Sequence, residues 1–235
     1  MFTKNSKIGI IAAMDAEIQQ LKDMAENVSV DKVSGIDFVK GTLCGVEVVM
    51  AKCGIGKVFA AICAQAMILT YKPDLIVNIG VGGSLSKNLK IADIAISESV
   101  VQHDMDTSPI GDPYGYLNGL DRIFIPANKE AAQLIKECAD ELGINNEIGV
   151  IASGDCFVNS TAKKKFITDN FKGIACEMEG AAVGHVCFVN DTDYCIIRAI
   201  SDSGDEDAQD DYAVSLEKAS KAEMKVMKLF LEKLK

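Results

Sequence analysis

The stretch YCIIRAISD, residues 194–202, decides the fold class of this chain. Its run from Tyr194 to Ile200 is almost continuously apolar and rich in β-branched residues, as in strands that are covered on both faces. The run nevertheless contains Arg198 and ends on Ser201 and Asp202, and charges in or beside a buried strand need a partner or a task. Because ligands of α/β proteins meet the ends of such strands, the stretch predicts an α/β fold with a site at this end.

A purely structural explanation of these polar residues competes with the functional one. Arg198 and Asp202 could pair with other charges, and Asp202 could cap the segment that follows it. Other carboxylates at strand-to-helix junctions favour a site, because Glu17 follows the first expected strand, and Glu177 and Glu179 precede an apolar helix. Taken alone, Glu17 would be explained as a carboxylate that complements a helix dipole.

The composition and the charge exclude several classes of partner. The chain has 235 residues, of which 49% are hydrophobic, and this is ample for a sizeable core. Its net charge of −10 and its pI near 4.7 argue against nucleic acid or an anionic membrane surface as the partner. The eight cysteines follow no disulfide or zinc spacing, no run is long enough to cross a membrane, and the N-terminal run does not suit a signal peptide. We therefore expect a cytoplasmic protein.

Strand-length apolar runs alternate with helical patterns along the whole chain, without a linker, a repeat or a low-complexity segment. This alternation predicts one α/β domain over residues 1–235. The expected strands are Lys7–Met14, Asp31–Lys40, Val46–Cys53, Asp74–Gly80, Ile91–Gln102, Glu147–Ser153, Ile174–Cys176 and Tyr194–Ile200. The expected helices are Asp15–Asn27, Lys57–Tyr71, Asn128–Leu142, Thr161–Asn170, Ala181–Val189, and a C-terminal helix whose buried face carries Met224, Met227, Leu231 and Leu234.

Two glycine-rich segments, CGIGKV at 53–58 and GVGGS at 80–84, match neither a Walker loop nor the dinucleotide fingerprint. We interpret the first as a place where the backbone passes close to a ligand or a neighbouring strand. The second is expected to be a loop, which either lets the backbone approach a ligand closely or forms a plain tight turn. The helix expected at 57–71 is apolar almost all round, which predicts burial or, at a surface, a subunit interface. Residues 107–122 show no period and are expected to form a long loop at a site or an interface. Phe157 follows a strand end and could belong to the core or stack on a base.

Carboxylates carry the chemistry that this sequence offers. The stretch HDMD at 103–106 is thin evidence for a metal, because His185, the only other histidine, lies in an apolar helical stretch, and we expect no metal site. No nucleophile motif accompanies either histidine. The remaining candidates are carboxylates with one well-placed cation: Glu17, Glu177, Glu179, Asp202 and Arg198. They suit general acid and base catalysis, as in glycosyl hydrolysis, and predict a small-molecule enzyme whose substrate the residues alone leave open.

The motifs KIGIIAAMDAE, CGIGKV, SGDCF at 153–157, EMEG and RAISD occur in this order, and together they strongly resemble the 5′-methylthioadenosine/S-adenosylhomocysteine nucleosidases of the purine nucleoside phosphorylase-like family. The resemblance covers nearly the whole chain, from about Lys7 to the C-terminal helix. It implies a three-layer α/β/α sandwich with a central mixed β-sheet, a homodimer, and no metal or other cofactor. It also implies hydrolysis of the adenine–ribose bond of 5′-methylthioadenosine and S-adenosylhomocysteine, with 5′-deoxyadenosine as a further candidate substrate.

The same resemblance implies roles for individual residues. Glu17 matches the base that activates water, Asp202 the acid that protonates adenine at N7, and Glu179 the residue that binds the ribose hydroxyls. Phe157 matches the ring that stacks on adenine, and the backbone of Val158 the group that reads its edge. The other residues that it places around the substrate are Ala13, Met14, Ile55, Val81, Glu177, Met178, Arg198, Ser201 and Tyr212.

The sequence departs from the family at a few of these positions. Val81 stands where many members have a serine near the attacking water, so water positioning must rest on the charged residues. Thr107 and Ile110 match positions that reach the partner subunit's 5′-substituent pocket, and Tyr212 matches an aromatic that covers that end. All three differ from the common family residues, which leaves the preference among 5′ substituents, including that of aminofutalosine, open.

Two other functions remain as alternatives. A purine nucleoside phosphorylase would share the fold, but phosphate needs strong positive donors, and the chain has only two arginines, Arg122 and Arg198. Glu17 would also repel phosphate. A non-catalytic nucleoside-binding protein would need Phe157 and Glu179, but not both an acid and a base. We therefore expect an enzyme that transfers the sugar of a nucleoside to water.

Overall fold

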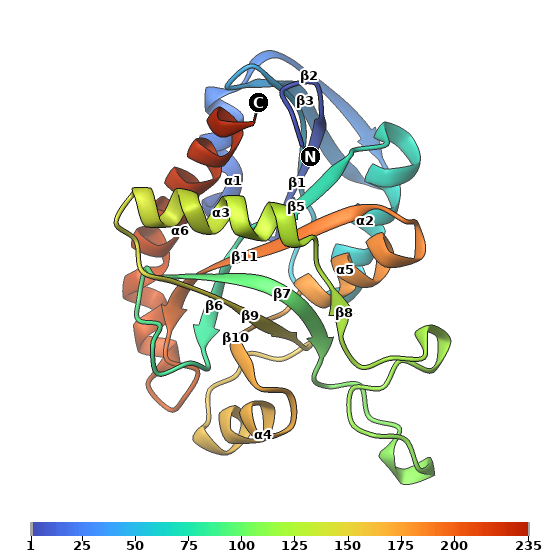
Figure 1. The fold of residues 1–235 in the computed structure, drawn as a ribbon, viewed down its shortest axis with the longest axis vertical. Coiled ribbons are helices and arrows are strands. Elements are labelled where there is room, and N and C mark those ends of the chain that lie inside the picture. The colour runs from blue at the N-terminus through green and yellow to red at the C-terminus, as the bar shows by residue number, and fades with distance from the viewer. Residues whose placement is uncertain (1, 235) are drawn as a thin grey trace.

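The computed structural model describes residues 2–234, and these residues build a sheet of eleven strands in the order β2-β3-β4-β1-β5-β11-β6-β10-β9-β7-β8 (Figure 1). The strands are β1 Lys7–Ala12, β2 Glu26–Val33, β3 Ile36–Leu43, β4 Val46–Lys52, β5 Leu75–Asn78, β6 Val81–Ser84, β7 Ile94–Gln102, β8 Ile125–Pro126, β9 Asn146–Ser153, β10 Gly173–Glu177 and β11 Asp193–Asp202. The helices are α1 Asp15–Met24, α2 Lys57–Tyr71, α3 Lys129–Glu141, α4 Thr161–Phe171, α5 Gly180–Val189 and α6 Ala208–Lys233, with short 3₁₀ turns η1 Ser108–Ile110 and η2 Asn118–Leu120.

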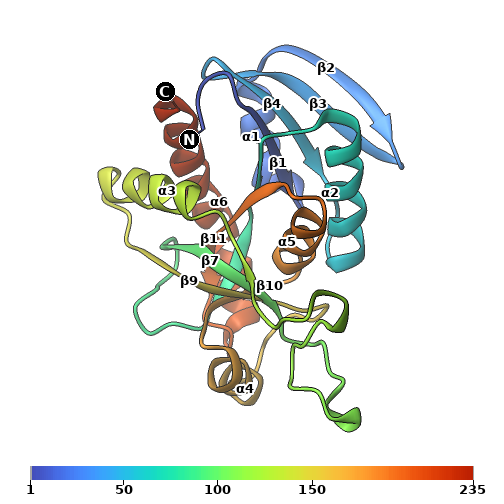
Figure 2. The same cartoon turned by 45° about the vertical axis from the view of Figure 1, so that its right-hand side comes forward.

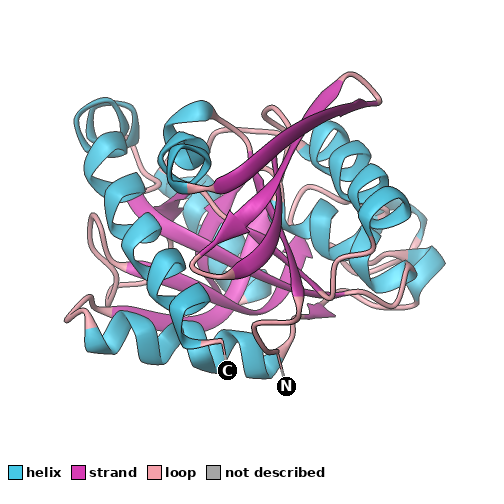
Figure 3. Cartoon of the chain, turned by 90° about the horizontal axis from the view of Figure 1, so that it is seen from above, coloured by secondary structure: helices cyan, strands magenta, loops and turns pink. Residues whose placement is uncertain are grey.

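Two hydrophobic cores lie on opposite faces of the sheet. One core joins the sheet to α1, α3 and α6, and the other joins it to α2 and α5. Figure 3, seen from above, shows the helices on both sides of the strands. The strands pair in both directions, because β1, β4, β5 and β11 are parallel whereas β2, β3 and β4 form antiparallel pairs. The expected three-layer α/β/α sandwich with a mixed sheet is therefore confirmed.

Strand β11 lies in the middle of this sheet, as its apolar sequence predicts. It pairs in parallel with β5 and β6 and antiparallel with β7, and all of its residues after Asp193 are buried. Ile196 is in register with Asn78 at the end of β5, and Ala199 with Val81 at the start of β6. The carboxyl end of β11 therefore lies beside the link between β5 and β6.

One predicted helix end and one predicted strand near the N-terminal end of the chain are wrong. Helix α1 ends at Met24 and not near Asn27, because Asn27 has a φ of 55° and the chain already pairs as β2. The single strand expected over 31–40 is a hairpin of β2 and β3. Its two turn residues, Ser34 and Gly35, have φ values of 52° and 80°, as the two-residue turns that suit the twist of a hairpin require.

The segment GVGGS is also different from the prediction, because it forms strand β6 and not a loop. β6 runs between β11 and β10, and its glycines let the neighbouring chains approach closely. A Cβ atom on Gly82 would lie 2.8 Å from the carbonyl oxygen of Cys176, and one on Gly83 would lie 2.7 Å from Oδ1 of Asp202. The glycines of β6 thus let the backbone approach Asp202 closely.

The segment 107–122 is a long connection, as expected, with η1 and η2 as its regular turns. It projects from the body of the molecule (Figure 2). Within residues 2–234, none of the helices combines the length and the apolar character that crossing a membrane requires.

Candidate active site

A cavity of about 420 Å³ opens at the carboxyl ends of β1, β10 and β11 and beside the first turns of α6. This volume is in the range of small-molecule sites, which is about 300–1,000 Å³. The lining consists of Ala13, Met14, Glu17, Ile55, Val81, Gly82, Gly83, Cys156, Phe157, Val158, Cys176, Glu177, Met178, Glu179, Ser201, Asp202, Gln209 and Tyr212. Of the predicted site residues, the cavity thus brings together every one except Arg198, Thr107 and Ile110.

Glu17 lies in the first turn of α1, where its carboxylate folds back onto the helix start. Oε2 accepts the backbone N–H groups of Ala13 at 3.0 Å and Met14 at 2.9 Å, and Oε1 accepts that of Val81 at 3.1 Å. The side chain is 3% exposed. Burial raises the pKa of Glu17, while the positive charge of Arg198 and these hydrogen bonds oppose the rise. The residue therefore caps its own helix and also lines the cavity.

Asp202 ends β11 in quite different surroundings. Its Oδ2 accepts the hydroxyl of Ser201 at 2.8 Å and its Oδ1 accepts the N–H of Gly204 at 2.9 Å. Burial raises the pKa of Asp202, and the negative charges of Asp211 and Asp205 raise it further, against the two hydrogen bonds. The geometry therefore favours a carboxyl group that keeps its proton longer than a surface aspartate does.

Arg198 lies behind the cavity wall and not in the lining, which refines its predicted place in the pocket. It is 1% exposed, and its guanidinium holds the carboxylate of Glu177 and both the carbonyl oxygen and the side-chain oxygen of Asn78. Oε2 of Glu179 lies 3.8 Å from Nη2. The surrounding carboxylates keep Arg198 protonated by raising its pKa against the effect of burial. Its charge therefore acts on the carboxylates that line the cavity.

Glu177 lines the cavity, but its oxygens are held by protein donors. Oε2 accepts the N–H groups of Glu179 at 3.0 Å and Gly180 at 2.7 Å in addition to Arg198, and Oε1 accepts the hydroxyl of Ser153. This carboxylate thus fixes the turn into α5 on which Glu179 stands.

Glu179 is the freer of the two glutamates in the EMEG motif. Its Oε1 accepts the N–H of Gly56 at 2.8 Å, which assigns a role to the CGIGKV segment. Gly56 has a φ of 101°, a conformation that favours glycine, so the motif is built to present this N–H. Burial and the nearby charge of Glu177 raise the pKa of Glu179 to about 7.

Aromatic and thioether groups form an apolar part of the cavity lining. Phe157 is 46% exposed, so it does not belong to the core. It meets Tyr212 edge-on, with the ring centroids 5.9 Å apart, and the hydroxyl of Tyr212 lies 3.5 Å from the sulfur of Met14. An exposed ring at a cavity mouth is suited to stacking on a planar ligand.

Thr107 and Ile110 do not reach this cavity from their own chain. They lie in the projecting segment 107–122, where the side chain of Ile110 is 82% exposed. In the HDMD stretch, Asp104 forms an ion pair with Lys57, whose Nζ lies 2.7 Å from Oδ1 of Asp104. Among residues 2–234, no group of three or more His, Cys, Asp or Glu side chains is arranged to hold a metal.

Five lining residues escaped the sequence analysis as individual residues. Gly82 and Gly83 belong to a segment that was expected near a ligand, so their signal was present. Cys156 and Cys176 also line the cavity. Each directly precedes a predicted site residue, Phe157 and Glu177 respectively, and this adjacency was their only signal in the sequence. Gln209 stands in an acidic stretch at the start of α6, where nothing in the sequence distinguishes it.

Comparisons with known proteins agree with this geometry. The model of the phosphorylase superfamily matches residues 7–235. A 5′-methylthioadenosine/S-adenosylhomocysteine nucleosidase from Shewanella pealeana is 38% identical over 214 residues, which cover 91% of this chain and 93% of the relative. A crystal structure of a mutant of the Helicobacter pylori nucleosidase with 5′-methylthioadenosine in its active site has a TM-score of 0.94 at 36% identity, covering 98% of this chain and 100% of that chain. A structure of the futalosine hydrolase of Helicobacter pylori has a TM-score of 0.93 at 37% identity, covering 97% and 98%.

Proposed function

The chain belongs to the phosphorylase superfamily and, within it, to the 5′-methylthioadenosine/S-adenosylhomocysteine nucleosidases, and on this premise we propose how it hydrolyses its substrates. The reaction cleaves the N-glycosidic bond of 5′-methylthioadenosine or S-adenosylhomocysteine and releases adenine and the thioribose product. In this proposal Asp202 is the general acid and Glu17 is the general base, and the remaining lining residues orient the nucleoside.

One observation carries the choice of water over phosphate as the second substrate. Four carboxylates line the cavity: Glu17, Glu177, Glu179 and Asp202. Among the described residues, no Lys, Arg or His belongs to this lining. Arg198 is occupied by Glu177 and Asn78, and Arg122 lies over the ring of Phe188 at 4.1 Å. A phosphate dianion would meet negative charge without a free donor cation, whereas an oxocarbenium-like transition state is stabilised by negative charge.

The proposed chemical step uses the two carboxyl groups in opposite senses. The carboxylic acid of Asp202 donates its proton to N7 of adenine, so the electron pair of the breaking C1′–N9 bond is accepted by a purine that leaves as a neutral base. The carboxylate of Glu17 takes a proton from water as the water oxygen bonds to C1′. The raised pKa of Asp202 supports the acid role, and the three N–H groups on Glu17 support the carboxylate form.

The other residues hold the substrate in this geometry. Glu179, which accepts the N–H of Gly56 and lies near Arg198, would accept hydrogen bonds from the ribose hydroxyls, beside Met178. Phe157 would stack on adenine and the backbone of Val158 would read its edge. The 5′ substituent would lie against Met14, Ile55 and Tyr212.

We further propose that the enzyme acts as a homodimer. Helix α2 and its neighbourhood support this, because its large apolar side chains Val58, Phe59, Ile62 and Leu69 are between 43% and 69% exposed. Thr107 and Ile110, on the projecting segment, would complete the partner subunit's cavity at the 5′ end. The free thiols fit a reducing, cytoplasmic setting, and the reaction fits methionine salvage.

Product analysis tests the proposed function directly. The protein is incubated with 5′-methylthioadenosine with and without inorganic phosphate, and adenine and the sugar product are separated by chromatography. We expect adenine and free methylthioribose at the same rate in both mixtures. A sugar phosphate that forms only with phosphate would make the protein a phosphorylase, and the absence of adenine together with tight substrate binding would make it a binding protein. Parallel incubations with 5′-deoxyadenosine and aminofutalosine rank the 5′ substituents.

A further inference from the structure

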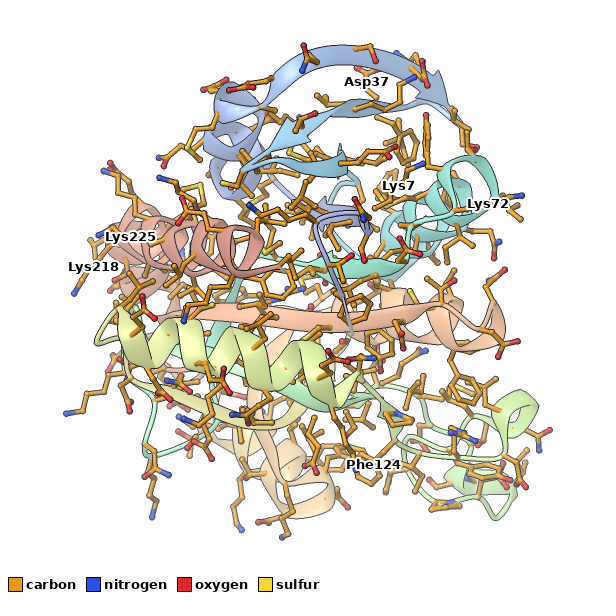
Figure 4. All side chains as sticks on the ribbon, turned by 45° about the horizontal axis from the view of Figure 1, so that its top comes forward. Lys7, Asp37, Lys72, Phe124, Lys218 and Lys225 are labelled. Atoms are coloured by element: carbon orange, nitrogen blue, oxygen red, sulfur yellow. The ribbon has the colours of Figure 1, made fainter. Side chains whose placement is uncertain are left out.

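A buried carboxyl group outside the cavity takes no part in the proposed chemistry. Glu223 lies in the middle of α6 and is fully buried, whereas Lys218 and Lys225 of the same helix point into solvent (Figure 4). Most of its buried neighbours along the helix are apolar, among them Ala219 and Val226, and the nearest polar one is Ser220. A carboxyl group in such a position costs free energy unless it has a partner or a task.

The partner of Glu223 is the link between β5 and β6. Its Oε1 accepts the backbone N–H of Gly80 at 2.8 Å, across 143 residues of sequence. The next N–H along the chain, that of Val81, donates to Oε1 of Glu17 at 3.1 Å. Two consecutive N–H groups of one link therefore hold two different carboxyl groups, one on α6 and one on the proposed catalytic base.

The link has little freedom to move without moving the base. A Cβ atom on Gly80 would lie 2.9 Å from Oε1 of Glu17 and 3.6 Å from Cζ of Arg198. The carbonyl group of Asn78, just before the link, accepts Nη1 of Arg198 at 3.1 Å, and that of Gly80 accepts the N–H of Ala199 at 3.0 Å. The Glu223 contact fixes the remaining polar group of Gly80, so the direction of the next N–H depends on it.

We propose that Glu223 is a positioning residue that, as a neutral carboxylic acid, holds Gly80 so that the N–H of Val81 stays directed at Glu17. The inference rests on the proposed function in one respect, the role of Glu17 as the base. Burial raises the pKa of Glu223 well above its usual range, which agrees with a neutral group. The charges that act on it are Arg198 on β11, which lowers its pKa, and Glu17 on α1, which raises it, while β6 carries no charged side chain.

The test compares Glu223→Gln with Glu223→Leu. Gln keeps an oxygen for the N–H of Gly80 and carries no charge, so we expect kcat, KM and the acidic limb of the pH profile to stay within about twofold of wild type. Leu removes the acceptor and releases the link. The carboxylate of Glu17 then loses a hydrogen bond, so its pKa rises by about one unit and the acidic limb of the pH profile moves up by the same amount. On that limb kcat falls about tenfold, with KM nearly unchanged. Lys225→Gln, on the solvent face of α6, is the matched control and should change none of these values.

A titration that needs no turnover separates this inference from the proposed function. The amide signal of Val81, followed by NMR against pH, reports the ionisation of Glu17 in wild type and in both variants, whether or not the protein cleaves nucleosides. A midpoint that is the same in Glu223→Leu as in wild type would overturn the positioning role. A midpoint that moves to lower pH in Glu223→Gln would show that Glu223 is charged, which would also overturn the proposal. If Glu223→Leu does not fold, the Gln variant decides, because a neutral donor-acceptor must leave the midpoint unchanged.

Discussion

The carboxyl groups that line the cavity differ in what surrounds them. Glu17, Glu177 and Glu179 gather around one buried guanidinium, Arg198, and we call these four residues the Arg198 cluster. Asp202 forms no ion pair among the described residues, and the charges that act most on it are negative. Burial raises the pKa of Glu17 and of Asp202 alike, so the two environments differ in the charges beside each carboxyl group. The positive charge of Arg198 lowers the pKa of Glu17 and of Glu179 against the effect of burial, whereas the negative charges of Asp211 and Asp205 add to the effect of burial on Asp202.

Replacing the proposed acid, Asp202, should have the largest effect on activity. Asp202→Asn keeps the size of the side chain and the acceptor for Gly204, but it has no proton to donate to a leaving purine. We expect kcat for 5′-methylthioadenosine to fall by about 10³–10⁴-fold, at the upper end of what a general acid contributes. Binding of an unreactive substrate analogue, measured by calorimetry, should change little. A variant that keeps most of its kcat would remove Asp202 from the role of acid.

Removing the positive charge of Arg198 should destabilise the Arg198 cluster. Arg198→Met leaves the carboxylate of Glu177 buried without its partner, and such a loss destabilises proteins by about 3–5 kcal/mol. Urea denaturation measures the free energy of unfolding. The matched control is Arg122→Met, because the other arginine of the chain is held by the ring of Phe188 and by the carbonyl of Leu120 and should contribute only about 1 kcal/mol. Equal losses in the two variants would argue that the cluster is not held together by Arg198.

Glu179→Gln tests the contribution of one carboxylate of the Arg198 cluster to substrate binding. Gln still accepts the N–H of Gly56, but it loses the charge that strengthens hydrogen bonds from ribose hydroxyls. We expect kcat/KM for 5′-methylthioadenosine to fall by about 10–100-fold, which is the effect of one hydrogen bond to a charged group. The further penalty for a substrate without the 2′-hydroxyl should become smaller than in wild type. An unchanged penalty would mean that another residue binds this hydroxyl.

The sequence predicts Asp202 and Glu17 better than it predicts their environment. Apolar runs and turn residues locate the strand ends, and a strand end is where Asp202 and Phe157 stand. The sequence does not tell which side of a wall a side chain faces, so Arg198 was expected in the pocket and lies behind it. Glu223 was not predicted at all, because a glutamate between lysines on a helix looks like a solvated charge, and its contact with Gly80 exists only in the folded chain.

The Ser34–Gly35 turn was missed for a different reason. The residues on either side of Ser34 and Gly35 are strand-like, and the reversal depends on positive φ values at both positions. A Ser-Gly pair between strand-like residues is a recognised turn signal, so this error was avoidable. The strand in GVGGS was not, because glycines weaken a strand and it is the packing of β6 between β11 and β10 that makes them pair.

The pH dependence of the reaction tests both environments without a mutation, because it changes the protonation of Glu17 and of Asp202. Glu17 must be deprotonated to accept a proton, so activity is lost as the pH falls through its pKa, which burial places above the usual range. Asp202 must be protonated, so activity is lost as the pH rises through its own raised pKa. We expect a bell-shaped profile of kcat/KM that declines about tenfold per pH unit outside its limbs. The residual activity of Asp202→Asn should lose the alkaline limb and keep the acidic one. An alkaline limb that survives this substitution would belong to another group, and that group would then be the candidate for the general acid.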